Sequence, residues 1–350
     1  MIYRISDIWA GQPKPAIGLE LELESPKPQN VDWIKGSLWT VHNDGSLRKN
    51  GVEYVFVKPL WNGDIVAALE QFQDNTKGTK FLEDSINGST HVHYNVGHLC
   101  ATEVVSILVA WSILEDIFLG LCKPTRRGNL FALRYCDSNG FISTMLDGIR
   151  GRDDSESLVS LFRMFNSDRW KYMNLNVSTI RTLGTIEFRC YHSTADVDEI
   201  SSWINRLINF CERAVALGNP IDVLNFADTK LPVFIEQLTG IRPTDEMVDA
   251  CRNNMSTAFR MAYVVPKWED LVEFRKNKKQ EPKKQKKSSS TPEEQPPMFI
   301  SATGASTTRV FEEAITWVSR MNNAPTGGTR DVIVDDTAID ALIDFSTRNS

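Results

Sequence analysis

Four short segments of the chain place polar side chains at every second position between apolar residues. They cover residues 18–22, 51–53, 90–93 and 185–189. Because successive side chains of a strand point to opposite faces, each polar pair projects from one face and the intervening Leu, Val, Ile and Phe side chains enter a core. The pattern predicts strands whose sheet has one apolar face and one face rich in ionisable groups.

Turn signals and hydrophobic spacing extend this pattern into a predicted order of elements. Alternating segments bounded by turns at 43–46 and 178–183 predict strands over residues 16–24, 38–42, 53–57, 91–96, 172–177 and 184–191. Apolar residues at helical spacing predict helices over 62–76, 102–121 and 199–217, followed by three shorter helices within 221–276. Strands joined by hairpin turns, with helices to one side, are typical of an α+β fold with a largely antiparallel sheet.

Composition places the chain among soluble globular proteins, with 41% hydrophobic and 24% charged residues in a length of 350. Residues 104–121 have about the length of a transmembrane helix, but Glu115 and Asp116 interrupt them, so we predict a buried helix and no membrane association. The first fifteen residues lack the pattern of a signal peptide, and the six cysteines form no C-x-x-C pair, so we expect a cytoplasmic protein with reduced thiols.

The composition changes sharply after the last predicted helix. We assign residues 1–274 to one catalytic domain with a helical C-terminal part. Residues 275–298 are rich in Lys, Pro and Ser and predict a disordered linker. Residues 299–350 predict a tail with one or two short helices and a possible role in binding a protein partner. The net charge of −6 argues against general nucleic-acid binding, and the basic linker has no aromatic residues for stacking on bases.

The alternating segments would gather one set of ionisable side chains on a single sheet face. A face so rich in carboxylates is costly to bury without counter-charge. Divalent cations supply that charge, and an arginine beside them can contact a phosphate group. The pattern therefore predicts a metal site with a phosphate contact, formed by Glu20, Glu22, Glu53, His91, His93, Glu187 and Arg189.

Six motifs in order resemble the amidoligase family of glutamine synthetase-like carboxylate–amine ligases, in a phage-type form. The resemblance covers about residues 16–215 and implies a glutamine synthetase-like catalytic domain with a curved sheet. It also implies ATP and Mg²⁺ or Mn²⁺ as cofactors, small-molecule or peptide carboxylate and amine substrates, an acyl-phosphate intermediate, and a host cytoplasm as the location of a phage protein. The motifs are GLELE at 18–22, DGSL at 44–47, GVEYV at 51–55, STHVHYNV at 89–96, KYMNLNV at 171–177 and TIEFRCYHST at 185–194.

The same resemblance implies roles for individual residues. The metal ligands it implies are Glu20, Glu22, Glu53, His91 and Glu187. Arg189 and Glu53 match the catalytic positions, with Arg189 on the transferring phosphoryl group. Residues 44–46 would lie near the rim of the substrate pocket. The residues implied to bind ATP or substrate are Arg126, Arg127, Arg134, His93 and Asn176. The chain departs from the family at Ser89 and Thr90, where Gly followed by Leu or Met is common, and at residues 57–59 after the GVE strand.

Other functions fit parts of the pattern. A glutamine synthetase-like module without activity could serve as an interaction or structural protein. A zinc hydrolase could use His91, His93 and a carboxylate, although zinc sites favour nitrogen and sulfur ligands and carboxylates outnumber histidines here. Retention of zinc through purification would favour the hydrolase, and absence of both ATP turnover and Mg²⁺ binding would favour the inactive module.

Overall fold

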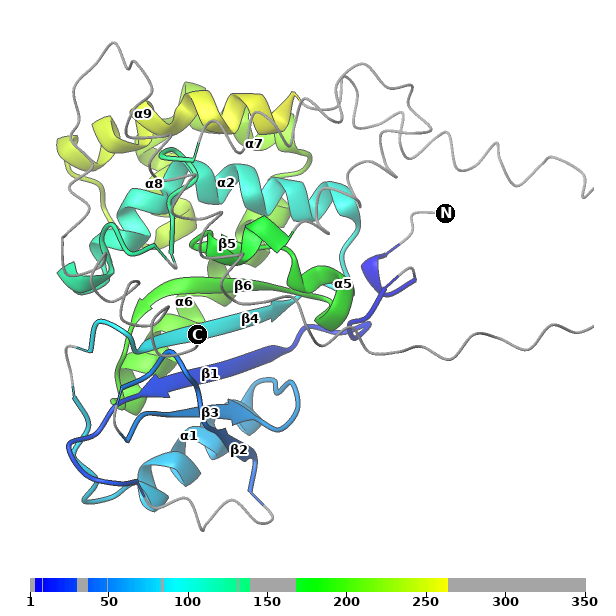
Figure 1. The fold of residues 1–350 in the computed structure, drawn as a ribbon. Coiled ribbons are helices and arrows are strands. Elements are labelled where there is room, and N and C mark those ends of the chain that lie inside the picture. The colour runs from blue at the N-terminus through cyan, green and yellow to red at the C-terminus, as the bar shows by residue number, and fades with distance from the viewer. Residues whose placement is uncertain are drawn as a thin grey trace, which may run out of the picture. The chain divides into compact units, whose positions relative to one another are not determined.

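The described part of the chain is built on a six-stranded sheet (Figure 1). The computed structural model describes residues 4–7, 9–29, 37–48, 50–82, 85–130, 132–138 and 168–263. Every pair of neighbouring strands is antiparallel, which confirms the predicted α+β class with a largely antiparallel sheet. Across the sheet the strands lie in the order β2 (Trp39–His42), β3 (Val52–Phe56), β1 (Ile17–Leu23), β4 (Ser89–Asn95), β6 (Thr185–His192) and β5 (Leu175–Asn176).

One face of this sheet is the main apolar core. Leu19, Leu21, Val92 and Phe188 are all completely buried on it. These residues alternate with the polar positions of the same strands, as a side-chain period of two requires. Burial of the large apolar side chains therefore fixes which residues of each strand face the opposite side.

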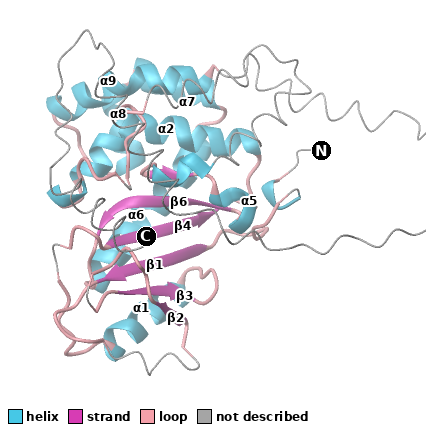
Figure 2. Cartoon of the chain, viewed as in Figure 1, coloured by secondary structure: helices cyan, strands magenta, loops and turns pink. Residues whose placement is uncertain are grey.

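Helices α1 (Gly63–Asn75), α2 (Ala101–Gly120) and α6 (Val197–Ala216) pack on the apolar face. The indole N–H of Trp39 donates to the Ala68 carbonyl of α1 over 2.8 Å. The rings of Trp111 in α2 and Phe188 in β6 are 4.9 Å apart, and α6 stacks its Trp203 ring on Tyr191. Helices thus cover one side of the sheet (Figure 2).

A second helical layer packs on α2 and α6 and consists of α7 (Pro220–Thr229), α8 (Leu231–Thr239) and α9 (Asp245–Ala262). Asn219 and Thr244 cap α7 and α9 through their side chains. Among the described residues, no helix is both long enough and apolar enough to cross a membrane. Glu115 of α2 is completely buried, where it accepts hydrogen bonds from the Tyr135 and Cys136 amides and from the Asn174 side chain.

Within residues 168–183 the structure differs from the sequence prediction. The expected strand over 172–177 is limited to Leu175–Asn176, because residues 168–172 form a 3-10 helix. The expected turn over 178–183 contains a short helix, α5 (Thr179–Leu183). The predicted linker at 275–298 and the predicted tail at 299–350 lie outside the described residues.

Three glycines, Gly11, Gly97 and Gly184, allow the N-terminal segment to pack closely against the end of the sheet. A Cβ atom on Gly184, whose φ is 69°, would lie 2.2 Å from the Cα of Gly11, and one on Gly97 would lie 2.5 Å from the Gln12 carbonyl oxygen. The side chain of Asn95 also bonds the backbone of Gln12 and accepts from its N–H over 3.1 Å. This close backbone approach requires residues without side chains.

Candidate metal centre

Strand register brings the predicted polar residues together on the face opposite the helices. Glu20 of β1 stands directly opposite His91 of β4, and Glu22 of β1 stands opposite Glu53 of β3. His93 of β4 pairs with Glu187 of β6. Residues predicted from four separate segments therefore occupy neighbouring positions on three antiparallel ladders.

The first group of possible metal ligands consists of Glu20, His91 and Glu187. One ligand atom of each lies within 4.8 Å of the others. His91 Nδ1 is 3.2 Å from a Glu20 oxygen and 3.4 Å from a Glu187 oxygen. His91 and Glu187 are buried, and the Glu20 side chain is about one quarter exposed, with 24% of its surface accessible. The group is therefore open to solvent on one side.

The second group consists of Glu22, Asp44 and Glu53, again with one oxygen of each within 4.8 Å of the others. Asp44 lies in the loop between β2 and β3, and its carboxylate accepts the Ser46 N–H over 2.7 Å. Sequence reasoning placed residues 44–46 only at the rim of a pocket. One signal in the sequence could have identified Asp44: it is an acidic residue in the turn of the hairpin that leads into the Glu53 strand.

The pKa values of these carboxyl groups reflect two effects, repulsion between the carboxylates and stabilisation by neighbouring histidines. Burial raises the pKa of Glu53 to about 7, and the charges of Glu20, Glu22 and Asp44 add to the effect. Burial alone would also raise the pKa of Glu20, but the neighbouring side chains of His91 and His93 outweigh it and lower that pKa strongly. The carboxylates near Glu53 thus lack sufficient positive charge, and a divalent cation fits this deficit.

Arg189 and Glu187 form an ion pair within β6, through a hydrogen bond from the guanidinium to the carboxylate. Burial would raise the pKa of Glu187, but Arg189 and then His93 lower it. Asn176 of β5 donates to the second oxygen of Glu187 over 2.7 Å. Both oxygens of this carboxylate are therefore oriented by neighbours, and the Arg189 side chain keeps 20% of its surface exposed.

Irregular pairing between β4 and β6 shapes the backbone beside Arg189. His91 of β4 stands opposite two residues of β6, Arg189 and Cys190, which is the geometry of a β-bulge. Arg126, from the 3-10 helix over residues 124–126, is buried and donates to the carbonyl oxygens of both bulge residues. Burial lowers the pKa of Arg126, and the charge of Glu22 acts in the opposite direction. Arg126 thus holds the backbone of the bulge.

The other predicted ATP or substrate residues take different positions. His93 is buried, with Nε2 3.0 Å from a Glu20 oxygen and Nδ1 3.0 Å from the Thr185 hydroxyl. Arg134 forms ion pairs with Asp116 and Asp137, which belong to neither metal group. Arg127 is exposed at the end of the same 3-10 helix that carries Arg126.

One hydroxyl that sequence reasoning did not assign lies between the two groups. Ser89 Oγ is 2.7 Å from His91 Nε2 and also donates a hydrogen bond to the Glu22 carboxylate. Gly18 lies opposite His93, and a Cβ atom there would lie 3.1 Å from the His93 Cβ atom. The glycine thereby leaves room for the imidazole beside Glu20.

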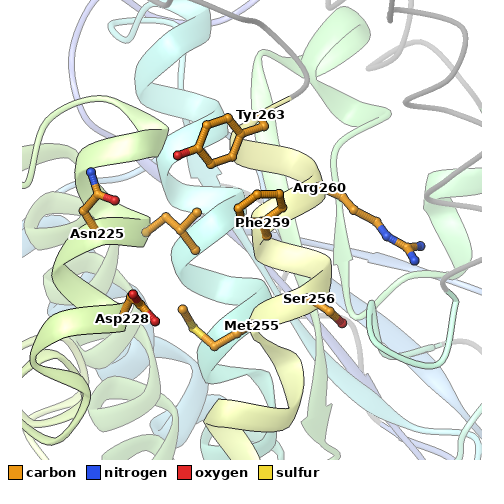
Figure 3. Close-up of a pocket in the computed structure, with 8 residues that line it drawn as sticks. Asn225, Asp228, Met255, Ser256, Phe259, Arg260 and Tyr263 are labelled. Carbon is orange, nitrogen blue, oxygen red and sulfur yellow. The ribbon is translucent and has the colours of Figure 1, made fainter.

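A separate pocket lies between α7 and α9, with a volume of about 600 Å³ (Figure 3). Phe259 of α9 and Tyr263, which directly follows that helix, line one wall, and Asn225 and Asp228 of α7 line the opposite wall. No residue of either metal group lines it. The residues predicted from the sequence to bind metal therefore lie on the sheet face and not in this pocket.

A family model described as "Putative amidoligase enzyme" matches residues 17–211, which is more than half of the chain. The chain belongs to this amidoligase family. The matched range contains both metal groups, Ser89 and Arg189, so the site lies wholly within the part shared with other amidoligases. Searches of the curated proteins and of the solved structures found no significant match. The mixed α/β fold rests on the structure itself. The glutamine synthetase-like assignment stays a prediction.

Proposed function

We propose that this amidoligase is an ATP-dependent carboxylate–amine ligase that forms an amide or isopeptide bond. The observation that supports the proposal best is the pair of metal-ligand groups on one open sheet face, with Arg189 beside the group that contains Glu187. Membership of the amidoligase family supports ligase chemistry independently. The substrates we expect are a small-molecule or peptide carboxylate and an amine.

The proposed reaction has two steps that conserve atoms and charge. The substrate carboxylate attacks the γ-phosphorus of ATP, which forms an acyl phosphate and releases ADP. The amine then attacks the acyl carbon, and inorganic phosphate leaves as the amide forms and the nitrogen loses a proton. The substrate carboxylate must be activated because its own oxygen is a poor leaving group. The phosphate of an acyl phosphate leaves readily.

The two groups fit two divalent cations. Glu20, His91 and Glu187 would hold one Mg²⁺ or Mn²⁺, and the Glu22 group would hold another. Cations held there would neutralise the phosphate oxygens of ATP as the phosphoryl group transfers. We assign Arg189 to the transferring phosphoryl group, since a guanidinium forms strong hydrogen bonds with phosphate. His93 and Asn176 would orient the Glu20 and Glu187 carboxylates that they contact.

The ligand chemistry favours this proposal over a zinc hydrolase. Each group contains at least two carboxylates, and His91 is the single nitrogen ligand among the six residues. Oxygen-rich sites suit Mg²⁺ and Mn²⁺, whereas zinc sites usually contain more histidine or cysteine. The acidic groups are also the reason to prefer an active enzyme over an inactive interaction module.

The test combines a substrate panel with one isosteric substitution. ADP release is measured with Mg²⁺ and ATP against amino acids, diamines and peptides. Glu187→Gln keeps the side-chain size but removes the charge that pairs with Arg189, so we expect ADP release to fall by about 100-fold or more. Glu236→Gln, on the exposed surface of α8, is the matched control and should keep full activity.

Two outcomes would contradict the proposal. If the folded Glu187→Gln variant kept full activity, the assignment of the active site to Glu187 and its neighbours would be wrong. A wild-type protein that neither binds Mg²⁺ nor releases ADP with any member of the panel would favour the inactive module. Circular dichroism of each variant shows whether it has folded, so that loss of activity is attributable to the site.

A further inference from the structure

We propose that Ser89 is a positioning residue that serves both metal groups at once by fixing the tautomer of His91 and orienting Glu22. Ser89 begins β4 and is buried, with 2% of its surface exposed. Its hydroxyl lies beside both groups and contacts His91 of the first and Glu22 of the second. The inference rests on the proposed function only for the identity of the ions that the groups bind.

The hydrogen bonds of the Ser89 hydroxyl have one consistent direction. The hydroxyl has a single proton, and it donates that proton to the carboxylate of Glu22. Its oxygen must then accept from His91 Nε2, which lies 2.7 Å away. His91 therefore carries a proton on Nε2, and the chain of donors runs from His91 through Ser89 to Glu22.

This direction determines what the other nitrogen of His91 can do. In the neutral ring Nδ1 then has a lone pair, and it faces carboxylate oxygens of Glu20 at 3.2 Å and Glu187 at 3.4 Å. Three electron-pair donors directed at one another repel unless a positive charge lies between them. Metal-binding histidines commonly donate their second ring N–H to an oxygen in this manner, which fixes the ring for coordination.

The same hydroxyl connects the two groups. His91 belongs to the first group and Glu22 to the second, and His91 Nε2 lies 3.9 Å from a Glu22 carboxylate oxygen. Ser89 therefore bridges a separation too long for a direct hydrogen bond. Loss of its hydroxyl should disturb the ligand geometry on both sides.

A neighbouring serine provides a matched control. Ser193 is buried to the same degree, with 1% of its surface exposed, and its hydroxyl donates to Glu22 over 2.8 Å. The acceptor in that bond is the backbone carbonyl of Glu22, not its carboxylate. Ser193→Ala thus removes one buried hydroxyl next to the same residue without touching the connection to His91.

Two measurements on the full chain test the inference. Calorimetric titration with Mn²⁺ should show two bound ions in the wild type. In Ser89→Ala both affinities should fall by about 10- to 100-fold, the effect typical of removing a residue that orients a metal ligand. Ser193→Ala should retain both affinities, and Ser89→Thr should recover them because it restores the hydroxyl.

The second measurement needs no metal. The chain has five histidines, so NMR of protein with ¹⁵N-labelled histidine can resolve each ring. Metal-free wild type should show His91 protonated on Nε2, and Ser89→Ala should lose this preference. A wild-type His91 protonated on Nδ1 alone would overturn the inference, as would Ser89→Ala that weakens neither Mn²⁺ ion or only one. If the wild type binds no Mn²⁺, the proposed function fails, while the tautomer still decides the role of Ser89.

Discussion

Replacement of Glu53 by Gln should make the metal-free protein more stable at pH 8 while it weakens the second metal group. Burial and the charges of Glu20, Glu22 and Asp44 raise the pKa of Glu53 to about 7, from an ordinary value of 4.5. Between these values the folded protein keeps a proton that the unfolded chain has released. Stability therefore falls as pH rises through this interval, and the whole loss is present above pH 7.

The magnitude follows from the separation of the two pKa values. Each pH unit corresponds to about 1.4 kcal/mol, which gives about 3 kcal/mol for a fully buried group. Glu53 is only half-buried, so solvent screening reduces the effect to about 1–2 kcal/mol. Because the amide introduced by Glu53→Gln has no charge, this variant should unfold about 2–6 °C above the wild type in EDTA at pH 8.

The assay is thermal unfolding in EDTA from pH 4.5 to pH 8, followed by the same scans with Mg²⁺. The difference between variant and wild type should be near zero at pH 4.5, where Glu53 is protonated, and should grow towards pH 8. Mg²⁺ should stabilise the wild type more than the variant. Glu236→Gln should show neither effect. A Glu53→Gln variant that is equally or less stable at pH 8 in EDTA would refute the repulsion argument.

Two further predictions concern the scaffold, and urea unfolding measures both. Gly184→Ala should cost about 3 kcal/mol or more, because its Cβ would overlap Gly11, whereas Gly240→Ala, with a similar positive φ but open surroundings, should cost only about 1 kcal/mol. Equal losses would exclude the close approach as the cause. Glu115→Ala should cost about 3–5 kcal/mol, because three N–H donors, two of them in buried hydrogen bonds, lose their acceptor, and Glu115→Gln should cost less. A loss below about 1 kcal/mol would show that water replaces the carboxylate.

Strand periodicity made much of the sheet predictable. Alternation in β1 places Glu20 and Glu22 on one face because Leu19 and Leu21 must be buried on the other. The same local argument placed His91 and Glu187 on their strands. It could not assign partners across the sheet, since register depends on contacts between segments that lie far apart in the sequence.

The remaining site residues depend on such distant contacts. Asp44 becomes a possible ligand only because the β2–β3 loop lies beside Glu22. Arg134 forms an ion pair with Asp116 of α2, and no local sequence pattern indicates this pairing. The bulge opposite His91, which Arg126 bonds, is likewise a property of two paired strands and not of either sequence alone.

Because of the strand order, the two metal groups can form at different stages of the chain's synthesis. The second group uses residues between Glu22 and Glu53, and β1 and β3 pair directly. The first group needs Glu187 on β6, which joins the sheet through β4. A growing chain that folds from its N-terminus can thus gather the three carboxylates of the second group long before Glu187 exists. The first group can form only once nearly the whole family-matched region has been made.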